Sequence, residues 1–135
     1  MKPSAIRALL LGQHARLRER LVVAEALAER LRAGGAVRSP FRDAVTTLLE
    51  ELIAHNVSEE TLLEPLLRAG DAYAAARVAR MHEEHFGEHA LMREALVGTD
   101  LTIIAENLPE LAETLRAHMD AEERTFLHPG VIRDG

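Results

Sequence analysis

The sequence predicts an all-α fold, an up-down-up-down antiparallel four-helix bundle formed by a single domain over residues 1–135. Apolar residues make up 47% of the chain and aromatic residues only 3%, so the core must be aliphatic. This composition, with abundant Glu and Arg, favours helix over sheet. Apolar residues also recur at three- and four-residue steps in four segments with short connections, and short connections make successive helices antiparallel.

Three breaks separate the predicted helices. The first is R-A-G-G-A-V-R-S-P, residues 32–40, whose Ser-Pro pair has the order of an N-cap followed by a proline in the first turn. The second is R-A-G-D, residues 68–71, a glycine stop followed by an aspartate cap. The third is V-G-T-D, residues 97–100, and N-L-P at residues 107–109 offers another stop shortly afterwards.

The helices are therefore predicted over about residues 4–33, 40–68 and 72–97, and from residue 101 or 109 to 127. Each has an apolar face with helical spacing, and leucines on these faces are expected to form a dry sleeve around the centre of the bundle. The apolar positions are Leu10, Leu17 and Leu21 in the first helix, Leu48, Leu52 and Leu62 in the second, Val78, Met92 and Leu96 in the third, and Leu111 and Leu115 in the fourth.

Charge and composition exclude several classes of protein. The formal net charge is −6, and Lys and Arg are interleaved with Glu, which argues against a nucleic-acid-binding surface. The absence of cysteine excludes disulfides, thiolate metal sites and a cysteine nucleophile, and it fits a reducing compartment. The apolar stretch A-I-R-A-L-L-L-G near the start is too short for a signal sequence or a membrane span. We expect a soluble, cytoplasmic protein.

Histidines occupy positions on the apolar faces of all four predicted helices. His14 follows Leu10 by four residues, for example, and His118 follows Leu115 by three. The third helix has the stretch M-H-E-E-H-F-G-E-H, residues 81–89, in which all three histidines continue the apolar stripe. The histidines on these faces are His14, His55, His82, His85, His89 and His118.

Carboxylates follow two of these histidines at helical spacing. Glu59 lies four residues after His55, and Glu122 lies four residues after His118. Residues four apart share one helix face about 6 Å apart along the axis, so both side chains of a pair can reach one cluster. When residue numbers are reflected across the three predicted loops, the histidines fall within a turn or two of one layer.

A buried layer of imidazoles and carboxylates indicates a metal site, because buried charge must be paired or coordinated. Nitrogen and oxygen donors without thiolate suit iron, manganese or zinc. Five imidazoles and two carboxylates are too many for one tetrahedral zinc ion. They suit two octahedral metals bridged by the carboxylates, which predicts a dinuclear centre with iron as the favoured metal.

Other chemistries lack their motifs. No histidine has a Glu three residues before it, as ferritin-like di-iron bundles require. The His-Glu-x-x-His motif of zinc proteases is missing, since H-E-E-H is one residue short. A histidine-phosphotransfer bundle would carry an exposed His-x-x-x-Lys-Gly motif, and the only lysine of the chain is Lys2.

Over nearly its whole length the chain resembles the hemerythrin family, and more closely its bacterial HHE-type cation-binding domains. The shared pattern is a His on the first helix, His-x-x-x-Glu on the second, His-x-x-x-His on the third and His-x-x-x-Glu-Glu on the fourth. The resemblance implies a non-haem di-iron site that binds O2 or a related small molecule at an open position on one iron. It implies bridging by Glu59 and Glu122 and terminal ligation by His14, His55, His85, His89 and His118.

The fourth helix departs from the oxygen carriers of that family, which have His-x-x-x-x-Asp. Here Glu122 stands four residues after His118, and Glu123 stands at the fifth position. The glutamate version resembles HHE proteins associated with sensing, with nitric oxide or peroxide chemistry, and with iron–sulfur-cluster repair. Repair proteins of that type usually add a cysteine-bearing segment, which this chain lacks.

Some alternatives stay open at this point. His82 and His89 are about 10.5 Å apart along a helix and compete as the partner of His85, although the family pattern selects His89. Glu60 and Glu123 are predicted on solvated faces, with a hydrogen bond to a ligand imidazole as the alternative. Glu83, Glu84 and Glu88 are predicted to be solvated. The functional alternatives to ligand binding or sensing are an enzyme that turns over peroxide or nitric oxide, and a metal-free helical interaction module.

Overall fold

The computed structural model describes residues 1–69, 72–98 and 100–134, and all regular secondary structure in these ranges is helical. The all-α prediction is confirmed. No helix in the described ranges combines the length and the apolar character needed to cross a membrane. The elements are α1 (Pro3–Arg32), α2 (Arg38–Ser58), the π-helical segment η1 (Glu59–Leu63), α3 (Glu64–Arg68), α4 (Ala74–Val97) and α5 (Leu101–Arg124).

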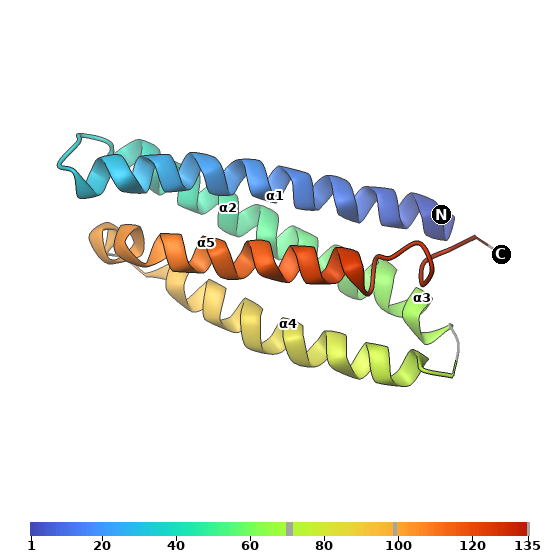
Figure 1. The fold of residues 1–135 in the computed structure, drawn as a ribbon. Helices are drawn as coiled ribbons and strands as arrows, with labels where there is room; N and C mark the ends of the chain where they lie inside the picture. Colours follow the sequence, from blue (N-terminus) through green and yellow to red (C-terminus); the bar gives the residue numbers. More distant parts are fainter. Residues whose placement is uncertain (70–71, 99, 135) are drawn as a thin grey trace.

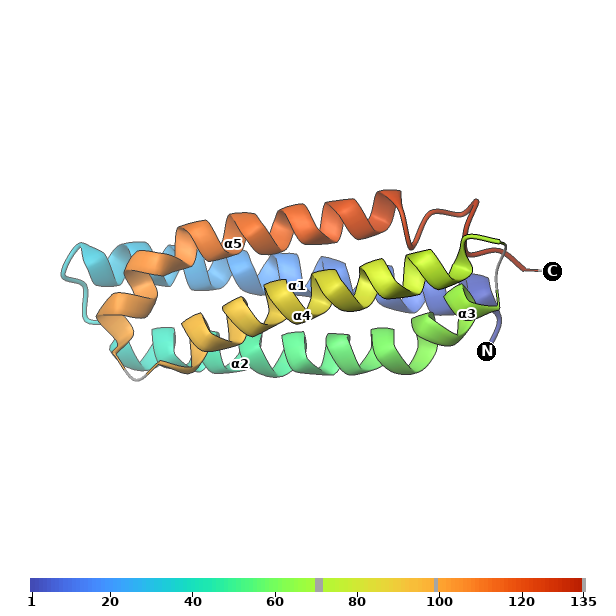
Figure 2. The same cartoon turned by 90° about the horizontal axis from the view of Figure 1, so that it is seen from below.

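Four long helical stretches lie side by side, with α2, η1 and α3 forming one of them. In Figure 1, α1 leads away from the N-terminus, and the α2–α3 stretch returns toward it. Helix α4 then leads away again, and α5 ends near the C-terminus. Figure 2 shows the same arrangement from below, with α4 lying between α2 and α5 in the view. Both termini therefore lie at the end where α3 meets α4.

Helix α5 begins at Leu101 because Asp100 caps it. The Asp100 carboxylate accepts a hydrogen bond from the backbone N–H of Thr102 at 2.9 Å, which satisfies a donor that has no partner inside the helix. The helix ends at Arg124, three residues earlier than predicted. The predicted cap at Asp71 falls outside the described residues.

Pro109 lies inside α5, where a proline removes the bond to the carbonyl four residues earlier. That carbonyl belongs to Ala105, and the Arg32 guanidinium at the end of α1 donates a hydrogen bond to it. The helix bends near its beginning in Figure 2 but continues. The predicted stop at residues 107–109 is wrong, because a side chain from another helix replaces the missing donor.

The segment η1 shifts the phase of the second helical stretch by one residue. The backbone N–H of Glu64 bonds the carbonyl of Glu59, five residues earlier, so that one extra residue fits into the turn. Leu63, four residues after Glu59 and on the same face of this stretch, is fully buried. Leu62 is only partly buried but packs against the apolar core, so the predicted apolar position at Leu62 lies at the edge of the core.

Two apolar clusters fill the interior, and the buried polar residues lie between them in sequence, except that Met119 of the wider cluster follows His118 in α5. The wider cluster packs around Phe41 at the α1–α2 loop end, and the terminal cluster packs where the termini meet. The wider cluster includes Leu17, Leu21, Phe41, Leu48, Leu52, Met92, Leu96, Leu108 and Leu115. The terminal cluster contains Ile6, Leu10, Leu63, Leu67, Val78, Met81, Phe126, Leu127 and Ile132.

The chain after α5 covers the terminal cluster. Phe126, Leu127 and Ile132 are buried in it, although they follow the last helix. Arg7 of α1 donates a hydrogen bond from Nε to the carbonyl of Leu127 at 2.5 Å, which fixes this segment against α1. The segment thereby contributes buried side chains to the apolar core at the end of the bundle nearest the termini.

We predict that Arg32→Ala lowers the free energy of unfolding by about 1–2 kcal/mol, because it leaves the carbonyl of buried Ala105 without a donor. Arg30→Ala is the matched control, since it removes the same charge from the last turn of α1 and should change stability by less than about 0.5 kcal/mol. Urea unfolding followed by circular dichroism measures both. Equal effects of the two substitutions would contradict the assigned role of Arg32.

Candidate metal centre

The structure brings the seven predicted ligand side chains together in one buried layer. None of them is more than 7% exposed, and they come from every long helical stretch. They are His14 on α1, His55 on α2, Glu59 on η1, His85 and His89 on α4, and His118 and Glu122 on α5.

Their donor atoms form two groups, each of which could hold a metal ion. One group is the three imidazoles of His85, His89 and His118. The other is His14, His55, Glu59 and Glu122. Within each group, one donor atom per residue lies within 4.8 Å of the others. The sequence predicted the membership of the layer, and the tertiary structure divides it into two parts.

Glu122 faces both groups. Its Oε1 is 3.0 Å from Nε2 of His14, and its Oε2 is 2.9 Å from Nε2 of His85 and 3.2 Å from Nε2 of His118. One carboxylate oxygen is thus directed to the two-imidazole side and the other to the three-imidazole side. A bridging carboxylate would use this arrangement.

Glu59 repeats the arrangement from the opposite wall of the bundle. Its Oε2 is 2.5 Å from Nε2 of His85, and its Oε1 contacts Nε2 of His55 and is 3.8 Å from Nε2 of His14. Glu59 is the first residue of η1. Leu63, four residues later on the same side, packs in the apolar core, and π segments are frequent at functional sites.

Three imidazoles have a second partner on the side away from the layer. Nδ1 of His14 donates to Glu123 Oε2 at 2.8 Å, and Nδ1 of His55 donates to Gln13 Oε1 at 2.7 Å. Nδ1 of His118 forms an ion pair with Glu88. Such partners fix the ring orientation and keep the proton on the outer nitrogen, which leaves the inner nitrogen free to bind a metal.

Two of these partners differ from the sequence predictions. Glu88 was predicted to be solvated, but it is half-buried beside His118, because it directly precedes His89 on the turn of α4 that faces α5. Gln13 was not predicted at all. Its position next to His14 was the available signal, and its amide also donates to Ser58 Oγ at 3.0 Å, which joins α1 to α2.

Glu122 and Glu123 are neighbours in sequence but have different roles. Glu122 enters the buried layer, whereas Glu123 is half-buried and accepts from both His14 and Arg18, the latter at 2.6 Å. The hydrogen-bonding alternative for Glu123 is therefore confirmed. Glu60 is exposed, as predicted.

The structure separates His82 from the layer. Its side chain is 49% exposed, and its Nε2 lies 3.2 Å from Glu64 Oε1 at the surface. Met81 occupies the buried position on that turn of α4, and His89 lies beside His85 with a distance of 4.7 Å between ring centroids. The prediction that His82 continues the apolar stripe is wrong, because the seam between α4 and its neighbours follows Met81 there.

The two carboxylates hold protons on neighbouring imidazoles in the metal-free protein. Burial alone would lower the pKa of His14 and of His85, but hydrogen bonds to Glu122 and Glu59 outweigh it and raise the pKa to about 9 and about 10, respectively. Burial raises the pKa of Glu59, and the bonds from His14, His55 and His85 outweigh this and lower it to about 2.

His89 behaves in the opposite way. Burial and the positive charges of His85 and His118 lower its pKa to about 3, so its imidazole stays neutral. Its Nε2 is a buried atom without a hydrogen-bond partner among the described residues. A neutral, unpaired imidazole nitrogen is a ready metal ligand.

The layer fits a cation. Several buried donor atoms of the layer have no well-formed hydrogen bond among the described residues. Nε2 of His89 has no close polar partner, and both oxygens of Glu59 and Nε2 of His118 contact only other atoms of the layer. Buried polar atoms are normally paired, so a concentration of unpaired ones in a single layer indicates a missing ion. Nitrogen and oxygen donors without sulfur suit iron, manganese or zinc.

We predict that the metal-free protein is most stable near pH 6.5. Above this value the unfolded chain loses histidine protons that folded His14 and His85 keep, so the free energy of unfolding falls as pH rises toward 9 to 10. Below pH 6.5 the unfolded chain binds a proton that folded His89 does not accept, so the free energy of unfolding falls as pH falls. Below pH 4.5 the unfolded chain also protonates Glu59, which stays ionised in the folded protein, and the free energy of unfolding falls further. Urea unfolding between pH 4 and 10 measures the profile, and a maximum above pH 8 would contradict the assignment.

Comparison with known proteins agrees with this geometry. The sequence model of the family described as "Hemerythrin HHE cation binding domain" matches residues 5–128, which include all seven buried polar residues. Searches among curated proteins and among solved structures gave no significant match. The matched region covers most of the chain, and the protein belongs to the hemerythrin HHE cation-binding domain family.

Proposed function

We propose that the protein holds a di-iron centre in an up-down-up-down bundle of the hemerythrin type, and that this centre reversibly binds O2, nitric oxide or peroxide. The observation that carries the proposal is the division of both carboxylates between the two donor groups. Glu59 and Glu122 each direct one oxygen to His14 or His55 and the other to His85. Two carboxylates that face both ways are suited to two bridged ions rather than one.

The donor groups suggest how the ions would be held. His85, His89 and His118 would bind one iron, and His14 and His55 would bind the other, with Glu59 and Glu122 shared between them. The group with fewer imidazoles, His14 and His55, would leave more of its ion open to an external ligand. When bound, the metals would supply Lewis acidity and a redox couple.

The chain itself would orient the ligands and exclude water. Glu123, Gln13 and Glu88 fix the rings of three imidazoles, and the wider and terminal clusters cover the layer on both sides. Exclusion of water strengthens electrostatic interactions in the layer, and the apolar cover allows only small molecules to reach it. A metal-free helical interaction module would leave the unpaired donor atoms of the layer without a partner. It is therefore the least supported of the three candidate functions.

Metal analysis with an optical spectrum of the anaerobically reduced protein, before and after exposure to air, tests the proposal. We expect about two irons per chain and a new charge-transfer band that disappears on deoxygenation. Irreversible oxidation with consumption of peroxide would instead support the enzyme. Absence of bound metal, together with an unchanged melting temperature in His55→Ala and Glu122→Ala, would contradict both.

We further predict that His89→Ala reduces iron retention about tenfold or more, because it removes one imidazole from a three-imidazole group. His82→Ala is the matched control, since it removes the same side chain seven residues away on the same helix but outside the buried layer. Iron content after dialysis against a weak chelator measures both variants. Loss of iron in His82→Ala with retention in His89→Ala would reverse the assignment.

A further inference from the structure

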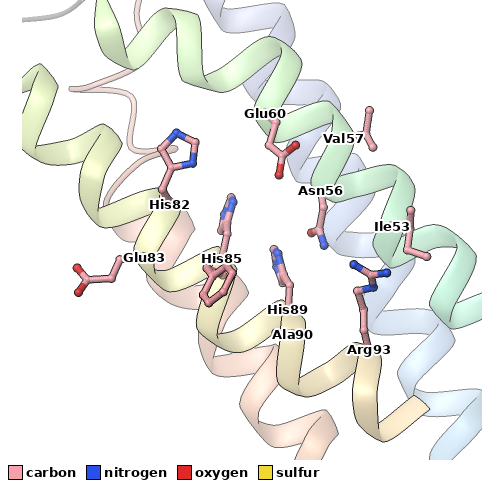
Figure 3. A pocket seen from close by; sticks show the side chains of 11 residues that line it. Ile53, Asn56, Val57, Glu60, His82, Glu83, His85, His89, Ala90 and Arg93 are labelled. Atoms are coloured by element: carbon pink, nitrogen blue, oxygen red, sulfur yellow. The ribbon is translucent and has the colours of Figure 1, made fainter. Parts of the chain in front are cut away.

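A groove of about 740 Å³ lies between α2 and α4 and reaches the buried layer from the side (Figure 3). Small-molecule sites typically measure about 300–1,000 Å³, so this groove has room for far more than a diatomic ligand. His85 and His89 form part of its wall, and residues 53–60 of the α2–η1 stretch form the opposite wall.

The rim of the groove is apolar and exposed. Ile53, Val57 and Phe86 line it and are 42%, 56% and 82% exposed, respectively. Exposed apolar side chains that gather around one hollow indicate a binding surface rather than scattered surface residues. Phe86 adds a free aromatic face, against which another aromatic ring packs well.

Three side chains that line this groove each have a buried polar atom without a hydrogen-bond partner among the described residues, and one of these atoms, Nε2 of His89, is already assigned to the metal layer. Nδ1 of His85 and Oδ1 of Asn56 are buried and make no hydrogen bond within the described residues. Nε2 of His85 faces the carboxylates, so Nδ1 is its outer nitrogen. The outer nitrogens of His14, His55 and His118 all have partners from the chain, and His85 lacks one on the side where the groove lies.

The chemistry of these two atoms defines a ligand. The outer nitrogen of a metal-bound imidazole carries a proton and donates, whereas an amide oxygen accepts. A hydroxyl group can accept from one and donate to the other. Both atoms are buried, so the molecule reaches them only when side chains of the groove wall move, and such rotamer changes take picoseconds to nanoseconds at exposed positions.

The charges around the groove favour a neutral molecule over an anion. Arg93 and the protonated His85 of the metal-free protein contribute two positive charges, and Glu60 and Glu83 contribute two negative charges, so these charges balance. We propose that this groove is a binding site for a small aromatic molecule with one hydroxyl group, a phenol, whose ring packs against Phe86 and whose hydroxyl bonds Asn56 and His85. The site lies beside the metal layer and goes beyond the binding of O2 or nitric oxide.

Phenol is the probe, with toluene as the analogue that lacks the hydroxyl and benzoate as the anionic analogue. Binding to the metal-free protein is followed by NMR titration, and binding to the iron-loaded protein by calorimetry. We expect saturable shifts confined to residues 53–60 and 82–93, and phenol binding at least threefold tighter than that of toluene or benzoate. Asn56→Leu keeps the size of the side chain and should weaken phenol binding about three- to tenfold without affecting toluene.

Two tryptophan variants test the location. Ala90 lines the groove, so Ala90→Trp should fill it and abolish binding of both phenol and toluene. Ala79→Trp is the matched control, an exposed alanine of α4 outside the groove, and should leave binding unchanged. Melting curves of all variants confirm that they fold.

Equal affinity for phenol and toluene, tighter binding of benzoate, or an unchanged affinity in Asn56→Leu would overturn the proposal. Absence of saturable binding to the folded protein would overturn it as well. The readout does not depend on gas binding. An iron-loaded protein that binds phenol but not O2 or nitric oxide would refute the proposed function alone, and the reverse result would refute only the phenol site.

Discussion

The structure depends on two buried carboxylates, Glu59 and Glu122, that need positive charge in the middle of an aliphatic bundle. A buried carboxylate without a partner is far too costly to retain, so the surrounding side chains must supply compensation. In the metal-free protein the compensation is a set of protons on imidazoles, and His14 and His85 have a raised pKa for this reason. A bound cation can replace the positive charge of these protons, so metal binding is coupled to proton release.

The rest of the bundle surrounds this polar layer with two kinds of support. Apolar clusters on both sides provide the burial that stabilises the fold, because the polar layer itself contributes little without a cation. Partners on the outer nitrogens then fix three of the imidazoles. No such partner is seen for His85 or His89 among the described residues, and the groove lies on their side of the bundle.

Two irregular places show how one helix depends on another. The π segment begins at Glu59, inside the layer, and inserts one extra residue into the second helical stretch. A strict helical period cannot predict this insertion, because it counts every turn as equal. Helix α5 continues through Pro109 because Arg32 supplies the missing donor, and the residues next to the proline in sequence do not indicate this contact.

The cytoplasmic location and the identity of the small ligand stay predictions.

The sequence alone determined the all-helical class and six of the seven members of the buried layer, because these histidines and carboxylates continue the apolar faces of their helices. It also determined the donor chemistry, since no cysteine is present. The tertiary structure decided which neighbours complete the layer. The choice of His89 over His82, the partners Glu88 and Gln13, and the groove beside Asn56 all depend on the distance between side chains on different helices, which spacing within one helix does not contain.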